Sequence, residues 1–315
     1  MQHWNSYWSR TKSLNSFAEG EHSQGYKGIV ASFWQTIFKS LPESTTILDL
    51  ATGNGGLAVL AQQFNASFDV YASDAANIAP LSQHAPSDSN YKHLEKIHFY
   101  GNMPSETLAF ENVQFDSVIS QFGFEYAEPA AALLAVNKAL KPNGEFIALV
   151  HHQDSFISTD CKIGLKVLKD LSKDNGLLLQ LQDFADFCQS ITNKVEPTAE
   201  QQVQFKQKNV DLLQQVKYQQ SKCNSEDELD WFNLLVKELL PAIIDWPQTD
   251  SKRVEELRDN LYSFQLRLQD QQAASWSNSD VEYIKTLLQD NWSSYEFDVM
   301  KIDAGIFCWV IKARK

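Results

Sequence analysis

The chain has 315 residues, 43% of them hydrophobic, which is enough for one large domain or two smaller domains with buried cores. Its formal net charge of −13 argues against a nucleic-acid partner, because proteins that grip a phosphate backbone usually carry a basic face. No apolar run in the sequence is long enough to cross a bilayer, so we expect no membrane span.

The four cysteines lie far apart and form no CxxC pair, which suits a reducing compartment better than a disulfide framework. The first residues also lack the basic and apolar regions of a secretory signal. We therefore expect a cytoplasmic protein. The histidines are dispersed without HxH or HxxxH spacing, which predicts that the chain holds no metal site.

Residues 1–40 are rich in aromatic side chains and are predicted to form an N-terminal helical and aromatic cap. The apolar residues of 28–40 recur with helical spacing, which indicates that Phe33, Trp34 and Phe38 pack against the rest of the fold. The other aromatic side chains either close over a ligand or pack the cap, and the sequence leaves both open. They are Tyr7, Trp8, Phe17 and Tyr26.

From residue 45 to residue 150, short β-branched or apolar runs alternate with helical patterns. The predicted strands are 45–50, 68–74, 97–100, 115–120 and 145–150. The predicted helices are 57–64, 79–84 and 129–140, and residues 141–144 are predicted to form a turn. This alternation is typical of an α/β fold with a parallel sheet and helices on both faces.

The alternation stops over residues 154–291, where several amphipathic helices are predicted instead. The clearest are 203–218, 229–240, 254–268 and 280–288. Prolines are expected to separate these helices, and they are Pro197, Pro241 and Pro247. The pattern indicates a large helical insertion that serves as a substrate cap or as the interface of a homodimer.

Strand patterns return at 295–299 and 307–311, and residues 303–305 between them carry a hairpin turn signal. The final hairpin therefore belongs with the alternating region rather than with the helices. We predict one sheet domain made of residues 41–153 and 292–315, interrupted by the insertion.

A glycine-rich segment, Asp49–Gly56, lies where the first predicted strand meets the first helix. Ligands of open parallel sheets bind beyond the carboxyl ends of the strands, and glycine lets the backbone approach them closely. Asp74 ends the second strand and is placed to accept bonds from both hydroxyls of a ribose. These features fit NAD and S-adenosylmethionine equally, and they also fit a tight turn that binds nothing.

The run Ile47–Gly55 closely resembles motif I of the class I S-adenosylmethionine-dependent methyltransferases, and it is particularly similar to that of the ubiquinone and menaquinone biosynthesis methyltransferases. Further motifs of this family are matched in order by Asp74, Gly101–Met103, Ser120–Gly123 and Leu140–Phe146. Each match is short, but their order along the chain favours S-adenosylmethionine over NAD as the cofactor.

The resemblance covers about residues 45–152 and the final hairpin. It implies a doubly wound, mostly parallel seven-stranded sheet with strand order 3-2-1-4-5-7-6 and the helical insertion between strands five and six. The hairpin then supplies the antiparallel seventh strand, which NAD-binding folds normally lack.

The resemblance also implies roles for the residues of the first two strand ends. Asp49 would orient the glycine loop or receive the methionine ammonium of the cofactor. The backbone at Ala51, Gly53 and Gly55 would pack against its methionine and ribose portions, and Asp74 would hold the ribose hydroxyls.

Three further residues are matched to the family's cofactor site. Asn102 and Met103 would meet the adenine, although the family often has aspartate where Asn102 stands. Gln121 would lie near the methionine end of the cofactor. The alternative interpretation is that Asn102 caps a loop and that Gln121 is an ordinary polar residue at a strand end.

Methyl transfer needs a general base only when the acceptor must lose a proton as it attacks. His151 and His152 end the fifth strand and titrate near neutrality, so they are the catalytic candidates, and further candidates are Glu125, Tyr126 and Asp154. Neighbouring strand residues point to opposite faces, so we expect one of the two histidines to reach the site. The alternative interpretation is that both histidines are structural.

The leading hypothesis is methyl transfer from S-adenosylmethionine to a small or medium organic acceptor, hydrophobic or aromatic by analogy with helical substrate caps. A second is a non-catalytic or assembly protein on the same fold, with the insertion as partner interface. A third is an NAD-dependent oxidoreductase, and a fourth is a methyltransferase that acts on protein or RNA.

Overall fold

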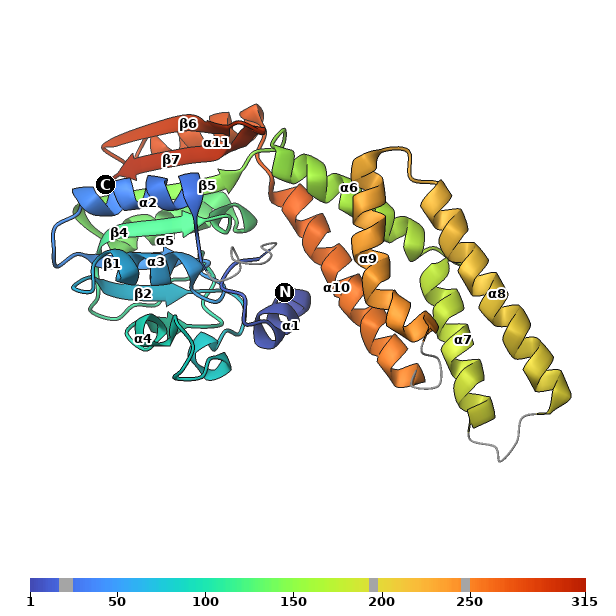
Figure 1. Ribbon diagram of the computed structural model, residues 1–315. Helices are drawn as coiled ribbons and strands as arrows, with labels where there is room; N and C mark the ends of the chain where they lie inside the picture. Colours follow the sequence, from blue (N-terminus) through green and yellow to red (C-terminus); the bar gives the residue numbers. More distant parts are fainter. Residues whose placement is uncertain (17–24, 193–197, 245–249) are drawn as a thin grey trace. The chain divides into compact units, whose positions relative to one another are not determined.

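The computed structural model describes residues 1–16, 25–192, 198–244 and 250–315. The chain folds into two compact units (Figure 1), a sheet unit of residues 1–158 and 273–315 and a helical unit of residues 159–272. Phe17, Pro197 and Pro247, on which the sequence made predictions, lie outside the described residues.

The sheet unit contains one seven-stranded sheet with strand order β3-β2-β1-β4-β5-β7-β6. Its strands are β1 (Thr46–Leu50), β2 (Asp69–Ser73), β3 (His98–Tyr100), β4 (Phe115–Gln121), β5 (Leu140–His151), β6 (Ser294–Ile302) and β7 (Gly305–Arg314). Strands β1 to β5 pair in parallel, and β7 pairs antiparallel with both β5 and β6. The predicted architecture and strand order are confirmed.

Alternate residues of the central strands enter two separate cores, one on each face of the sheet. Ile47 and Ile119 belong to the first core, whereas Leu48 and Val118 belong to the second. Helices α2 (Gly28–Ser40) and α3 (Gly56–Phe64) contribute to the first core, and α5 (Pro129–Ala139) and α11 (Asn278–Leu288) to the second. The remaining α-helices of this unit are α1 (Gln2–Arg10) and α4 (Tyr91–Leu94).

Helix α2 is part of the first core. Its Trp34 and Phe38 are fully buried there, and Phe33 packs against the same core. The helical spacing therefore identified the packing face of residues 28–40 correctly.

Two predicted features of the sheet unit differ in detail. The predicted turn at 141–144 lies within β5, as an irregular stretch where Asn143 has a φ of 65° and the pairing with β4 shifts its register. The predicted helix at 79–84 is a short 3-10 helix, η2 (Pro80–Gln83).

The helical unit is built from α6 (Phe156–Leu171), α7 (Leu177–Thr192), α8 (Ala199–Ser221), α9 (Glu226–Ile244) and α10 (Ser251–Ala274). It is narrower than the predicted insertion 154–291, because α11 buries Val281, Ile284 and Leu288 in the second core of the sheet unit. Its predicted use as a substrate cap or homodimer interface stays a prediction.

Pro241 does not end a helix, contrary to the prediction. It lies inside α9, which continues to Ile244. Proline removes one backbone hydrogen bond and disfavours a helix interior, but the next turn buries Ala242 and Ile243, and this packing outweighs the local preference. Within the described parts of the chain, no helix combines the length and apolar character that a membrane crossing needs.

Candidate cofactor and acceptor site

The loop after β1 forms the centre of the candidate site. It follows a strand whose last four residues are buried, and Thr52 N–H donates to the carbonyl of Ser73 at the end of β2 (2.9 Å). The loop then turns through left-handed backbone at Ala51, Gly53 and Gly55, with φ values of 55°, 56° and 90°. Gly55 caps the first turn of α3, so strand, loop and helix are directly connected.

Asp49 stabilises the conformation of this loop. Its Oδ2 accepts hydrogen bonds from the hydroxyl of Thr52 (2.5 Å) and from Ala58 N–H in α3 (3.1 Å). Burial raises the pKa of the Asp49 carboxyl to about 7, although both hydrogen bonds oppose that shift and nearby Asp74 adds to it. These contacts correspond to the first of its two predicted roles, and contact with a methionine ammonium stays a prediction.

Asp74 joins the loop after β2 to the glycine loop. Its Oδ2 accepts from Gly53 N–H (2.8 Å) and its Oδ1 accepts from Ala76 N–H (2.7 Å). Burial raises the pKa of the Asp74 carboxyl to about 6 against these hydrogen bonds. The side chain is half-buried, and each carboxylate oxygen can accept more than one hydrogen bond. The carboxylate therefore has the capacity to receive the hydroxyls of a ribose.

Asn102 and Met103 lie beside Asp74, as the motif order predicts. Asn102 N–H donates to the carbonyl of Ala76 (2.9 Å), and Met103 N–H donates to the carbonyl of Asp74 (2.8 Å). The Asn102 side chain is exposed and Met103 is half-buried. Their backbone thus shapes the loop after β2, and contact with an adenine stays a prediction.

Gln121 is the last residue of β4, and its side chain is hydrogen-bonded to Trp34. Its Oε1 accepts a hydrogen bond from the indole N–H of Trp34 in α2 (2.5 Å), and only 8% of the residue is exposed. The structure therefore gives Gln121 a packing role between β4 and α2. The predicted position near the methionine end of the cofactor is not tested.

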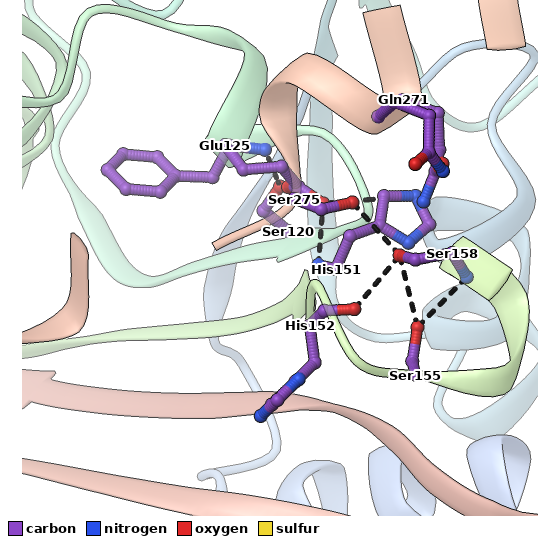
Figure 2. Close-up of polar contacts among 10 residues, drawn as sticks. Ser120, Glu125, His151, His152, Ser155, Ser158, Gln271 and Ser275 are labelled. Carbon is purple, nitrogen blue, oxygen red and sulfur yellow. Dashed lines mark hydrogen bonds and ion pairs between the residues drawn. The ribbon is translucent and has the colours of Figure 1, made fainter. Parts of the chain in front are cut away.

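His151 and His152 point to opposite sides of the strand end, as Figure 2 shows. The ring of His151 stacks on Phe122, with centroids 4.3 Å apart. The ring of His152 stacks on Trp309 of β7 at 4.5 Å, and its Nδ1 accepts from Asp154 N–H (3.0 Å). Both contacts of His152 stabilise the strand end, and the choice between the two histidines as a base stays a prediction.

Glu125 is the buried partner of His151. Its Oε1 accepts from His151 N–H (2.9 Å) and lies 4.0 Å from Nε2 of the same residue. Burial raises the pKa of the Glu125 carboxyl to about 8 and lowers the pKa of His151 to about 3. Among the described residues, neither His151 Nδ1 nor Glu125 Oε2 has a hydrogen-bond partner. Both groups are therefore uncharged near neutral pH and retain a free polar atom.

A cluster of serine hydroxyls fixes the backbone beyond His151 (Figure 2). The hydroxyl of Ser158 donates to the carbonyl of His152 (2.9 Å) and lies 3.0 Å from the hydroxyl of Ser275. Trp276 N–H donates to the carbonyl of His151 (2.8 Å). The segment that returns to the sheet unit is therefore bonded directly to the end of β5.

Two residues next to the predicted motifs carry contacts that motif matching cannot reveal. The side-chain amide nitrogen of Asn54, between the two loop glycines, lies within hydrogen-bond distance of three carbonyls of residues 8–13. Trp8 packs against Gly53. The sequence signal for both was present, in an asparagine inside a glycine loop and an aromatic residue outside the helical stripe, but their pairing depends on the fold.

A sheet of this order, with a left-handed glycine loop after β1 and an acid after β2, defines a Rossmann-like methyltransferase domain. The comparison of residues 48–148 with protein-family models agrees, because this segment matches the model described as a methyltransferase domain. Residues 48–148 thus match a methyltransferase-domain model, and the strand order of the sheet unit is the one that the resemblance to the class I S-adenosylmethionine-dependent methyltransferases implies. The site residues fit the predicted cofactor, S-adenosylmethionine, through the glycine loop and the free acceptor capacity of Asp74.

Solved structures with a similar fold have low sequence identity to this chain. The plantazolicin methyltransferase BpumL, in complex with a pentazolic desmethylPZN analog and SAH, is 11% identical with a TM-score of 0.43, covering 91% of this chain and 81% of that one. The glycopeptide N-methyltransferase MtfA, complexed with sinefungin, is 17% identical with a TM-score of 0.34, covering 45% and 62%. No curated protein matches the sequence.

Proposed function

We propose that this protein transfers a methyl group from S-adenosylmethionine to a small or medium organic acceptor of hydrophobic or aromatic character. The observation that carries the proposal is the carboxylate of Asp74, which the backbone N–H groups of Gly53 and Ala76 hold beside the glycine loop. The methyltransferase-domain match over residues 48–148 supports it.

When bound, S-adenosylmethionine supplies a methyl group on a positively charged sulfur, which is a good leaving group. The residues of the site then have to bind and orient the cofactor and exclude water. Asp74 accepts the ribose hydroxyls, the backbone of 51–55 lies along the ribose and methionine portions, and Asn102 and Met103 border the adenine. Asp49 holds the loop in its left-handed conformation through Thr52.

We assign to His151 the role of general base, which removes a proton from the acceptor. An uncharged imidazole can accept a proton as the acceptor atom forms its new bond to carbon. Burial alone makes His151 a weak base, but Glu125 lies 4.0 Å away and carries its own proton near pH 7. Above about pH 8 Glu125 releases its proton to solvent, and the resulting carboxylate stabilises the imidazolium that forms when His151 takes the proton of the acceptor. This arrangement suits an acceptor with an O–H or N–H group.

Isothermal titration with S-adenosylmethionine, S-adenosylhomocysteine and NAD tests the proposal. We expect both adenosyl ligands to bind and NAD not to bind. Asp74→Asn should weaken the binding of S-adenosylhomocysteine by about tenfold to a hundredfold. One of the two N–H groups loses its acceptor, and the negative charge is lost.

Asp69→Asn is the matched control, because Asp69 lies at the opposite end of the same strand and is exposed. His151→Gln should also leave the affinity for S-adenosylhomocysteine unchanged while it slows transfer to any acceptor found by screening. Tight binding of NAD, or an Asp74→Asn protein that binds S-adenosylhomocysteine like the wild type, would contradict the proposal. Binding of none of the three ligands would instead favour the assembly-protein hypothesis.

A further inference from the structure

Asn54, a buried residue of the glycine loop, contacts the N-terminal segment through its side chain. The amide nitrogen of Asn54 lies within hydrogen-bond distance of the carbonyls of Trp8 (3.4 Å), Thr11 (3.0 Å) and Ser13 (3.1 Å). Asn54 is 0% exposed. These carbonyls belong to the C-terminal end of α1 and to the turn after it. Asn54 therefore stabilises the position of that helix end against the glycine loop.

The Trp8 ring lies directly on the glycine loop. A Cβ atom added at Gly53 would stand 2.4 Å from Cζ2 of Trp8, so no larger residue fits beneath the ring. Trp8 is buried and forms a small apolar cluster with Ala76 and Ile78, which follow β2. Gly53 and Ala76 are the two residues whose N–H groups hold the carboxylate of Asp74.

Further contacts extend α1 across the ends of several strands. Gln83, in η2, donates from its amide to the carbonyl of Trp8 (2.6 Å), and Asn77 N–H donates to Oδ1 of Asn5 (2.8 Å). Trp4 meets Tyr126 edge to face, with ring centroids 5.8 Å apart, and Tyr126 belongs to η3 (Phe124–Tyr126) after β4. Helix α1 therefore contacts the loops that follow β1, β2 and β4.

We propose that α1 is a wall of the cofactor site, in which Trp8 braces Gly53 and Ala76 and thereby keeps the Asp74 carboxylate oriented toward a ribose. Asn54 is a positioning residue that acts through the backbone of residues 8–13. The inference rests on the proposed function and assigns to the N-terminal segment part of the affinity for an adenosyl ligand. It predicts that this affinity depends on residues far from the methyltransferase motifs.

The first experiment compares Trp8→Ala with Trp292→Ala by isothermal titration with S-adenosylhomocysteine. Both tryptophans are 7% exposed in the sheet unit, but Trp292 packs in the second core, near Phe146. We expect Trp8→Ala to weaken binding at least about tenfold. Trp292→Ala should lower the unfolding midpoint and leave the dissociation constant unchanged. If Trp8→Ala does not fold, Trp8→Phe replaces it, with a smaller loss of affinity expected.

The second experiment follows amide hydrogen exchange in residues 1–13. S-adenosylhomocysteine should slow exchange there in the wild type, and Asn54→Ala should remove most of that protection. Wild-type affinity in Trp8→Ala, or tighter binding because the ring obstructs the ligand, would overturn the inference and leave the proposed function standing. Failure of the wild-type protein to bind S-adenosylhomocysteine would instead count against the proposed function itself.

Discussion

At the scale of single residues, Glu125 and His151 form a buried pair of an acid and a base. An acid and a base lie side by side, both uncharged near neutral pH, because the surrounding protein excludes the water that would solvate their ions. A carboxyl group that keeps its proton at neutral pH is a source of pH-dependent stability as well as a candidate for catalysis.

The Glu125→Gln variant tests this state through stability. The pKa of Glu125 rises from 4.5 to about 8 on folding, so between these values the folded wild type binds more protons than the unfolded chain, and its stability falls as the pH rises. Glutamine keeps the acceptor for His151 N–H and has no proton to lose. We expect Glu125→Gln to gain at least about 1 kcal/mol relative to wild type between about pH 5 and about pH 8.5.

Urea unfolding at the two pH values gives this difference. Asp49, Asp74 and His151, whose pKa values also shift, are present in both proteins, so their contributions largely cancel. Glu111→Gln, at an exposed loop position, is the control and should show no such gain. A Glu125→Gln protein whose relative stability is the same at both pH values would show that Glu125 is already ionised at pH 5.

At this scale the sequence could predict the position of a residue in the sheet where a motif fixed it. Asp49 lies at the end of β1 and Asp74 follows β2, and both strands alternate regularly with helices, so their place near the carboxyl edge could be deduced. The sequence could not choose between His151 and His152, because the choice depends on Phe122 and Trp309, which reach the two rings from β4 and β7. Glu125 was one of several candidates for the same reason.

At the scale of elements, the loops after β1 and β4 touch one another. A Cβ added at Gly123 would lie 2.5 Å from the Cβ of Ala51, and Ala51 itself has left-handed backbone. The two loops therefore approach as closely as an alanine and a glycine permit. This contact sets the spacing between the loop after β1 and the loop after β4.

A double-mutant cycle measures the contact between these loops. Gly123→Ala should destabilise the protein by about 1–3 kcal/mol, because the new methyl group overlaps that of Ala51. In the Ala51→Gly background the same substitution should cost less, since the obstructing methyl group is gone and only the carbonyl of Ala51 remains close. Urea unfolding of the four proteins provides the coupling energy. Equal costs in both backgrounds would show that the loops move apart freely.

The sequence predicted the sheet elements better than the helical ones. Strands β1 to β5 have turn signals and buried runs that local patterns reveal, whereas α6 and α7 were not resolved within a long amphipathic region. The prediction at Pro241 was wrong because the burial of Ala242 and Ile243 outweighs the preference of proline against a helix interior. The predicted end of the insertion lies too far along the chain, because α11 has the same amphipathic pattern as the helices before it. It differs from them in packing against the second core of the sheet unit.

At the scale of the whole molecule, the two compact units should respond differently to ligand. Only the sheet unit carries the candidate cofactor site, and a ligand stabilises the unit that binds it. At a hundredfold excess over its dissociation constant, S-adenosylhomocysteine should add about 2.7 kcal/mol to the sheet unit. Scanning calorimetry should show two transitions, of which one moves upward with ligand.

Trp292→Ala assigns the transitions, because its side chain lies in the second core of the sheet unit and the variant should lower the ligand-sensitive transition alone. A single transition that shifts as a whole would show that the two units unfold together. The sequence predicted that a helical block interrupts the sheet, but whether the block covers an acceptor depends on long-range packing that local patterns do not encode.

The strand order has a consequence for how the chain folds as it is synthesised. Strand β5 is complete at His151, yet its antiparallel neighbour β7 begins at Gly305, and Cys308 of β7 pairs with His151. The loops around Asp49 and Asp74 can therefore form early, while the edge of β5 stays open until β7 has been synthesised. An open apolar edge invites pairing with other chains. The strands that carry the glycine loop and Asp74 are thus complete long before β7 is made, and we expect the growing chain to be most prone to aggregation while the helical insertion is being made.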